Sequence, residues 1–557
     1  MEKEQKFIEE MFSKGVLVNK EILSRGLDAS LSHKLEEEQD LLVLTADYWE
    51  VITQQEVLVD WYQLDHHRVE AEKERDQELY QLQLQQLRRD RLRVDNHGEG
   101  EEVSSLEVSL RDLSGQFTTE EQASPRELNP LDFNPLDLNK GVVQVLLSYE
   151  HTPQKYDVVD FTRFFSSRYR FLEGILRHRQ ELAGTTTIKR VAERTERGSA
   201  GVIGLVQEMG ITKKGSIHLK LEDFTGTISV IIPQSKKDLF HLAKDLVLDE
   251  VIGVTGTSQG AVIFADQVVW PDLPEGELKC GPQEEYAIFL SDLHVGSRLF
   301  LAEPFEKFLR WLAGEAGNEE QRELARKVKY IFISGDVVDG VGVYPSQEEE
   351  LALLDIKEQY RQCAALLARI PSEKQIIMCP GNHDVVHIAE PQPIFYKEYA
   401  EVLHTLPNVT LLSNPGMVTI GKTENFSGFD VLLYHGYSFD YYVAHVESIR
   451  QGGGYHRADL IMKFLLKRRH LAPSFKSTPY CPGYAEDPLL IKRIPDFFAT
   501  GHIHYCSAAN YRGVTMISGS CWQDKTSFQE KLGHQPEPGR VPLVNLKTRD
   551  LRVLRFV

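Results

Sequence analysis

Short apolar runs recur along the second half of the chain, and each one ends in polar residues. The runs are Tyr286 to Leu290, Tyr330 to Ile333, Ile376 to Met378, Val431 to Leu433 and Phe497 to Ala499. A short run without alternating polar positions is typical of a strand that is covered on both faces. Helical patterns lie between the runs, as in 303–311 and 349–367, and the segments 541–546 and 551–557 have the pattern of a closing hairpin. This alternation predicts a layered α/β/α sandwich over residues 284–557.

Residues 185–275 show a different pattern, in which apolar and polar positions alternate with a period of two. Ile217, Leu219 and Leu221 alternate with polar residues, and the alternation resumes after a turn, at 228–232. Five or so short strands of this kind predict a small β-barrel of the OB type. Such a barrel often binds single nucleic-acid strands through aromatic and basic side chains, but a purely architectural barrel is an equally open alternative. The candidate contacts are Lys213, Lys214 and Phe224.

The part of the chain before the barrel contains weaker patterns. Residues 1–65 have apolar spacings of three and four, which predict a small N-terminal helical domain. Residues 66–140 begin as a solvated charged helix, with a partner-binding coil as the alternative. They continue as an acidic segment that is too poor in apolar residues to fold alone, and we expect a disordered linker there. Residues 141–184 are aromatic-rich and amphipathic, which predicts a helical connector that packs against the following domain.

The composition is that of an ordinary globular chain with an acidic balance. The 557 residues carry a formal net charge of −20, which argues against DNA binding by bulk electrostatics and requires any strand contact to be local. The strongest basic run contains Lys467, Arg468 and Arg469; a solvated helix face is the favoured interpretation, and phosphate contact is the alternative. No run of about 18 apolar residues occurs, and the six cysteines form no C-x-x-C pair. We therefore expect a cytoplasmic protein without a membrane span.

The polar residues that follow the apolar runs are of the kinds that bind transition metals. They are Asp292, His294, Asp336, Asn382, His435, His502 and His504. Imidazole nitrogen with carboxylate and amide oxygen, and no thiolate, suits manganese, iron or zinc better than calcium. In open α/β sheets, ligands gather where strands end. We therefore predict a centre for two divalent metal ions, with Asp336 as the bridging carboxylate; the family resemblance described below implies manganese, with iron, zinc or magnesium as alternatives. Such a pair activates water for attack on a phosphodiester.

Five motifs, in this order, resemble the calcineurin-like metallophosphoesterase superfamily. They are D-x-H (292–294), G-D-x-x-D-G (335–340), G-N-H-D (381–384), Y-H-G (434–436) and G-H-I-H (501–504). Most of them taken alone are uninformative or are more often a turn, but all five after strand-like runs are specific. The resemblance implies one ion held by Asp292, His294, Asp336 and His504, and a second held by Asp336, Asn382, His435 and His502. It also implies that His383 is the general acid that protonates the leaving oxygen and that Asp339 orients its imidazole.

The order of the modules resembles a narrower family. A helical front end, a linker, an OB-like barrel and a metallophosphoesterase domain are similar to the small subunit of archaeal family D DNA polymerases, as are the segments 469–473, 522–523 and 536–542. This resemblance implies a 3′→5′ exonuclease that acts on single-stranded or primer-template DNA. It also implies proofreading for a large catalytic polymerase subunit, in a heterodimer or a higher assembly. Two alternatives stay open: a catalytically silent scaffolding subunit, and a standalone metallophosphatase or phosphodiesterase.

Overall fold

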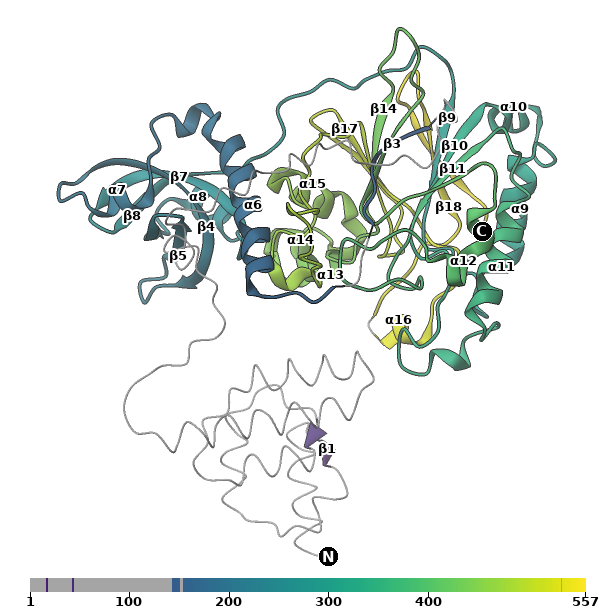
Figure 1. Ribbon diagram of the computed structural model, residues 1–557, viewed down its shortest axis with the longest axis horizontal. Helices are drawn as coiled ribbons and strands as arrows, with labels where there is room; N and C mark the ends of the chain where they lie inside the picture. Colours follow the sequence, from purple (N-terminus) through teal and green to yellow (C-terminus); the bar gives the residue numbers. More distant parts are fainter. Residues whose placement is uncertain (1–16, 19–42, 45–142, 151–153, 532) are drawn as a thin grey trace, which may run out of the picture. The chain divides into compact units, whose positions relative to one another are not determined.

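The computed structural model describes residues 17–18, 43–44, 143–150, 154–531 and 533–557 (Figure 1). The chain divides into two units, Met1–Ser105 and Leu106–Val557. In the first unit, β1 (Leu17–Val18) pairs in parallel with β2 (Val43–Leu44). The helical domain predicted at 1–65 and the charged helix and linker predicted at 66–140 otherwise lie outside the described residues. In the described part of the chain, no helix combines the length and the apolar character needed to cross a membrane.

Two six-stranded sheets form the body of the second unit. One has the strand order β12-β11-β10-β9-β18-β19, and the other has the order β16-β17-β15-β14-β13-β3. The strands are β3 (Val143–Leu147), β9 (Tyr286–Leu290), β10 (Val328–Ser334), β11 (Gln375–Cys379), β12 (Val409–Leu411), β13 (Gly416–Ile420), β14 (Phe429–Leu433), β15 (Phe497–Thr500), β16 (Ser507–Tyr511), β17 (Val514–Ser518), β18 (Arg540–Asn545) and β19 (Leu551–Arg555). Strands β9 to β12 are parallel, as are β14, β15 and β17, so each sheet gathers several carboxyl ends at one edge. The predicted closing hairpin is confirmed by the antiparallel pairing of β18 with β19.

The two sheets pack face to face, and helices cover their outer faces. Phe289 and Phe332 of the first sheet share a buried cluster with Val431 and Phe497 of the second. The first sheet is covered by α9 (Ala302–Leu312), α10 (Glu319–Lys327), α11 (Ile356–Leu367) and α12 (Lys397–His404), and the second by α13 (Phe439–His445), α14 (Glu447–Gln451) and α15 (Ala458–Arg468) (Figure 1). The domain therefore has four layers, α/β/β/α, and the predicted three-layer α/β/α arrangement is wrong. A strand covered by a second sheet is as apolar as one covered by a helix, so the pattern could not separate the two.

The segment predicted as a helical connector contains a strand as well as a helix. Strand β3 pairs antiparallel with β13 and completes the second sheet, so the phosphoesterase domain includes residues that precede the barrel. Helix α6 (Val158–Arg177) begins at a capping box, in which Asp157 accepts from the first turn and Asp160 accepts from the Asp157 amide. The connector ends in a 3-10 turn (Gln180–Leu182).

The segment predicted as an OB-type barrel forms a closed five-stranded barrel in the order β4-β5-β6-β8-β7. The strands are β4 (Gly198–Ile211), β5 (Ile217–Asp223), β6 (Gly226–Ile232), β7 (Val251–Gln259) and β8 (Val262–Val269). The apolar members of the period-two pattern, including Ile217, Leu219 and Leu221, are buried inside it. Two short helices, α7 (Ile188–Ala192) and α8 (Lys237–Ala243), contribute to the same core.

A network of buried charged side chains joins α6, the barrel and the phosphoesterase domain. Arg168 of α6 donates from Nε to Asp487 at 2.7 Å, and His470 donates from Nε2 to the same carboxylate at 2.8 Å. Arg468 of α15 pairs with Glu250, which lies just before β7 in the barrel, at 2.8 Å. All five side chains are buried, and we call them the junction network. Each carboxylate in it has a guanidinium partner.

Candidate metal centre

The loops that follow five strands carry all the predicted ligands. The loops after β9, β10 and β11 belong to the first sheet, and those after β14 and β15 belong to the second. Three groups of side chains have potential ligand atoms within 4.8 Å of one another. They are Asp292, His294 and His504; His294, Asp336 and His383; and Asp336, His435 and His502. Because His294 and Asp336 each occur in two groups, the three groups form one continuous cluster, which we call the metal cluster.

One end of the metal cluster is built around His294. Its Nε2 lies 3.1 Å from Nε2 of His504 and 3.9 Å from a carboxylate oxygen of both Asp292 and Asp336. Its Nδ1 donates to the Asp339 carboxylate at 3.0 Å, which leaves the Nε2 lone pair directed at the cluster. His504 lies 3.4 Å from Asp292 through Nε2. The four side chains expected around the first ion therefore meet here.

The other end is built around His435. Its Nδ1 donates to the Ser334 carbonyl at 2.9 Å, and its Nε2 lies 3.3 Å from Asp336 Oδ2 and 3.0 Å from Asn382 Oδ1. His502 belongs to the same group, and its Nε2 contacts a carboxylate of α13, Asp440, at 2.9 Å. That contact leaves Nδ1 of His502 free to face the cluster. The four side chains expected around the second ion are thus also brought together.

His383, the predicted general acid, lies at the rim of the cluster. Its amide donates to Asp336 Oδ1 at 2.8 Å, and its Nδ1 donates to the main-chain carbonyl of Asp339 at 2.7 Å. The Asp339 carboxylate lies 4.0 Å from His383 and bonds instead to His294, Gln347 and Gln523. Asp339 therefore contacts both imidazoles, but it holds His383 through its carbonyl rather than through its side chain.

The electrostatics of the cluster favour a cation. Among the described residues, the ion-pair partners of Asp292 and Asp336 are imidazoles, with no lysine or arginine among them. Burial opposes ionisation of Asp336, but His435 and His383 outweigh it and hold the pKa of this carboxyl well below its usual range. Burial also opposes a charge on His435, yet Asp336 and Asp292 raise its pKa to about 10. Buried carboxylates thus demand positive charge here, and this donor set fits divalent transition ions.

Two motif glycines are required because backbone passes directly against the ligands. A Cβ atom on Gly381 would lie 2.2 Å from Asp336 Oδ1. A Cβ on Gly335 would lie 2.3 Å from His435 Nδ1, and Gly335 also has a φ of +90°. Side chains at either position would displace a predicted ligand. The glycines of G-D-x-x-D-G and G-N-H-D therefore serve the cluster rather than a generic turn.

Several residues that support the cluster were not among the predicted site residues. Asp440 contacts His502, Gln529 contacts His504 Nδ1 at 3.0 Å, and Gln523 donates to Asp339 at 2.8 Å. Asp384 closes the G-N-H-D loop by accepting from the Gly381 amide at 2.9 Å, and burial raises the pKa of Asp384 to about 7. Of these four, Asp384 alone belongs to one of the five motifs, and Gln523 alone to one of the three family-like segments.

The basic run predicted as a possible phosphate contact is mostly internal. Arg468 and Arg469 are buried; Arg468 pairs with Glu250, and Arg469 donates to the carbonyls of Ile491 and Lys492. Lys467 lies over the Trp270 ring, 3.8 Å from its centroid. The phosphate-contact alternative is therefore wrong for the two arginines, whose guanidinium groups are used inside the protein, and the favoured solvated-face interpretation is wrong for them as well.

The candidate contacts on the barrel differ from one another. Lys213 and Lys214 are exposed in the turn between β4 and β5. Phe224 is half-buried, with Tyr169 against its edge and Arg170 over its ring. The two lysines stay candidates for strand contact, whereas the aromatic surface of Phe224 is already used.

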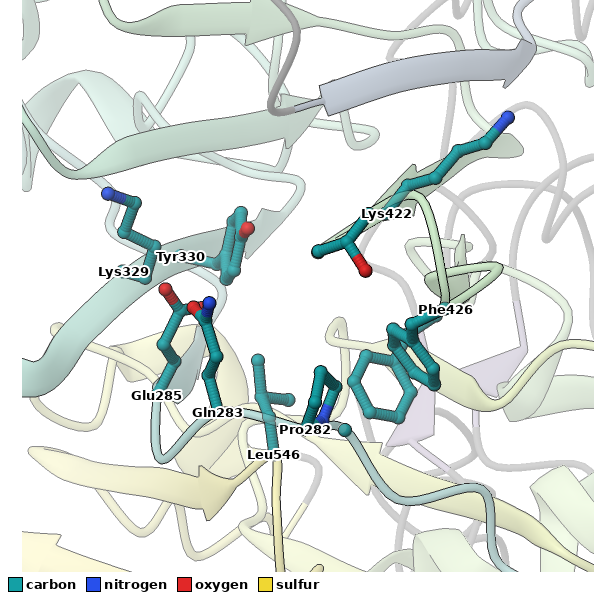
Figure 2. A pocket seen from close by; sticks show the side chains of 12 residues that line it. Pro282, Gln283, Glu285, Lys329, Tyr330, Lys422, Phe426 and Leu546 are labelled. Atoms are coloured by element: carbon teal, nitrogen blue, oxygen red, sulfur yellow. The ribbon is translucent and has the colours of Figure 1, made fainter.

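A surface pocket lies at the other end of the first sheet (Figure 2). Its lining includes Glu285, Lys329, Tyr330, Lys422 and Phe426. Glu285 precedes β9, and Lys329 and Tyr330 stand near the start of β10, whereas the metal cluster follows the carboxyl ends of the same strands. The pocket is therefore separate from the candidate metal centre.

Comparison with known proteins agrees with this geometry. The family model described as calcineurin-like phosphoesterase matches residues 287–506, a range that contains all seven predicted ligands. The chain is similar to the DNA polymerase II small subunit of Methanothermobacter thermautotrophicus, with 39% identity over 70% of this chain and 78% of the relative. It is also similar to the proteins of the same description from Archaeoglobus fulgidus (41% identity, 69% and 75% covered) and Halobacterium salinarum (36% identity, 71% and 75% covered).

Proposed function

Because this chain belongs to the family of archaeal DNA polymerase II small subunits, we propose that it is the 3′→5′ exonuclease subunit of a family D DNA polymerase. One observation supports the proposal most strongly. Two buried carboxylates, Asp292 and Asp336, lie against four imidazoles and an amide. Among the described residues, no lysine or arginine pairs with either carboxylate. A scaffold without catalytic chemistry would be under no physical requirement to keep buried carboxylates that no lysine or arginine pairs.

The residues of the centre have two proposed roles: seven are metal ligands and one is a proton donor. Asp292, His294, Asp336 and His504 would hold one divalent ion, and Asp336, Asn382, His435 and His502 the other. When bound, the ion pair supplies Lewis acidity that stabilises charge on the phosphate and lowers the pKa of water from about 15.7 towards about 7. Asp339 and the Ser334 carbonyl fix the tautomers of His294 and His435, so that Nε2 of each faces the ions.

His383 is assigned the role of general acid. Its Nδ1 donates to the Asp339 carbonyl, so the general acid is the doubly protonated ring, whose second proton is on Nε2. During hydrolysis, water loses a proton to solvent, the resulting hydroxide oxygen bonds to phosphorus, and the bond from phosphorus to the 3′ oxygen breaks. That oxygen leaves with its electron pair and takes the Nε2 proton. The products are a 5′-mononucleotide and a strand shortened by one residue.

Other components of the reaction lie outside this centre. We assign the five-stranded barrel to the OB type and Lys213 and Lys214 to contact with a single strand, because both are exposed. DNA synthesis is assigned to a large partner subunit, in a heterodimer or a higher assembly. The metal is assigned as manganese from the family resemblance; the mixture of imidazole and carboxylate donors suits manganese, iron and zinc alike.

The decisive experiment uses the full-length chain and a 3′-labelled single strand. With manganese, the wild type should release labelled mononucleotide, alone or after the large subunit is added, and excess chelator should stop the release. Asp336→Ala should abolish it, while Asp238→Ala, at an exposed carboxylate on α8, should not change it. Absence of labelled mononucleotide under all these conditions, with wild type and Asp336→Ala alike, would leave a silent scaffold as the function.

A further inference from the structure

Beside His383 lies an aromatic pair that the proposed hydrolysis does not use. The Tyr344 ring lies 6.2 Å from the His383 ring, and Phe528 of α16 (Ser527–Lys531) stacks on Tyr344 at 5.4 Å with an interplanar angle of 24°. Tyr344 is only 7% exposed, whereas Phe528 is 39% exposed. We propose that this pair, the aromatic platform, seats the terminal nucleobase of a single-stranded substrate. This inference rests on the proposed nuclease function and names the part of the substrate that the platform recognises.

The platform is held rigidly by one carboxylate. The Tyr344 hydroxyl donates to Glu350 Oε2 at 2.8 Å, and the Ser527 amide donates to Glu350 Oε1 at 3.0 Å. Glu350 thereby ties the loop that carries Tyr344 to the start of the helix that carries Phe528. Two rings from distant parts of the sequence are thus fixed before any substrate binds, which lowers the entropic cost of stacking a base.

The same two segments also hold the metal cluster, so the distance from platform to centre is fixed. Gln529, which follows Phe528, contacts His504 Nδ1 at 3.0 Å. Gln347, three residues after Tyr344, donates to the Asp339 carbonyl at 2.8 Å, the oxygen that also accepts from His383. The Phe528 ring is therefore held at a set position relative to His504 and to the proposed proton donor, His383.

The chemistry of the rim suits a base better than a phosphate. Two apolar side chains, Val341 and Ile388, are about half exposed. They lie on the loops that carry Asp339 and His383, respectively. Stacking on an exposed aromatic ring is available to every base, because each has a π-face, so it gives affinity without sequence preference. A base inside a duplex already stacks on its neighbours and must first be unpaired, so the platform would favour frayed, mispaired or single-stranded ends.

Binding tests the platform without hydrolysis. A short single strand with 2-aminopurine at its 3′ end is titrated with the full-length chain in EDTA, and its fluorescence is followed. Wild type should quench the probe on binding. Phe528→Ala should remove the quench and raise Kd about fivefold or more, since base stacking contributes roughly 1–3 kcal/mol. Phe528→Trp should keep the quench and the wild-type Kd. Phe528→Leu, which keeps the apolar bulk without a π-face, should lose the quench and bind more weakly.

A matched control exists elsewhere on the chain. Phe475 is 42% exposed and stacks on Tyr480 at 5.4 Å, but it packs against Phe161 and Phe165 of α6 rather than beside His383. Phe475→Ala should therefore leave quench and Kd unchanged. If wild type gives no quench, or if Phe528→Ala behaves like Phe475→Ala, the platform is refuted, and Phe528 is then better explained as a contact for a protein partner.

A cleavage assay distinguishes failure of the platform proposal from failure of the nuclease proposal. Wild type with manganese should cleave a strand with a normal 3′ nucleotide at least about fivefold better, in kcat/KM, than one ending in an abasic nucleotide. Phe528→Ala should cleave both at the slower rate. A variant with a damaged metal centre, such as Asp336→Ala, should instead cleave both strands more slowly than Phe528→Ala does. If wild type cleaves neither strand, the nuclease proposal fails, while the fluorescence titration still decides whether a base is bound.

Discussion

The metal cluster and the junction network are built from similar buried ionisable groups, yet they differ in one respect. In the junction network, Asp487 and Glu250 are each paired with a guanidinium group. In the metal cluster, Asp292 and Asp336 face imidazoles. An arginine carries its charge at every relevant pH, whereas an imidazole can surrender its proton and offer a lone pair. Buried carboxylates that keep their own arginine are structural, and buried carboxylates surrounded by imidazoles are prepared for a metal cation.

The largest expected effect is on the rate of strand cleavage when the proton donor beside the metal cluster is removed. His383→Ala should lower kcat for strand cleavage by about 100- to 10,000-fold, because a positioned general acid contributes that range. Manganese binding, measured by isothermal titration calorimetry, should survive, because His383 is not among the seven proposed ligands. Equal loss of metal affinity and of rate would place His383 among the ligands and erase its assigned role.

Removal of an arginine from the junction network should destabilise the protein without a specific effect on strand cleavage. Arg168→Met leaves Asp487 without its guanidinium partner, and breaking such a buried pair costs about 3–5 kcal/mol. The expected result is a clear fall in the denaturant midpoint. Arg361→Ala, which removes an exposed pair with Glu358, should cost at most about 1 kcal/mol. Similar denaturant midpoints for the two variants would mean that the buried junction pair stabilises the protein no more than the exposed pair does.

Added metal should stabilise the metal cluster and not the junction network. Manganese at 100 times its Kd should stabilise the wild type by about 2.7 kcal/mol, because it binds the folded state. The shift in the thermal midpoint should persist in Arg168→Met, measured from that variant's own baseline, and vanish in Asp336→Ala. A shift that survives Asp336→Ala would show that the ion binds elsewhere on the protein.

Acid should act on the junction network through His470. Its Nδ1 accepts from the Ala472 amide at 2.9 Å and its Nε2 donates to Asp487, so the folded protein holds a neutral ring. Burial, reinforced by Arg168, lowers the pKa of His470 from 6.5 to about 4. Between these values the unfolded chain binds the extra proton, so stability falls as pH falls. From pH 7 to pH 5 the expected loss is about 2 kcal/mol. His470→Gln should flatten the profile of denaturant midpoint against pH, and an unchanged slope would contradict the assignment.

The smallest expected effect concerns exposed charge. Lys213→Ala with Lys214→Ala should weaken binding of a single strand only a few-fold and reduce the slope of log Kd against log salt by about 0.7 for each phosphate that the lysines neutralise in the wild type. Binding should be measured at several salt concentrations, with Arg361→Ala as the control for removal of a distant positive charge. An unchanged slope would remove the barrel turn from the DNA path.

The meeting of the side chains in the metal cluster was predictable because these residues follow apolar runs in a fixed order, and strand ends bring such residues together. The two-sheet architecture was not predictable, since Phe289 and Phe497 look equally buried whether a sheet or a helix covers them. Asp440 and Gln529 come from short helices without a motif, and only the folded chain brings them to His502 and His504. The predictions for Arg468 and Arg469 were wrong for a related reason: a string of charges does not reveal that Glu250, from another domain, neutralises Arg468.

Strand β3 carries a consequence for the way this protein is made. It belongs to the second sheet, where Val143 and Leu147 pair with Ile420 and Met417, although the whole barrel intervenes in the sequence. On the ribosome, β3 emerges early and has no neighbour until β13 has been synthesised, so the barrel can fold well before the sheet is closed. A chain that starts after the barrel would leave the edge of β13 open to pairing with other molecules, which favours aggregation.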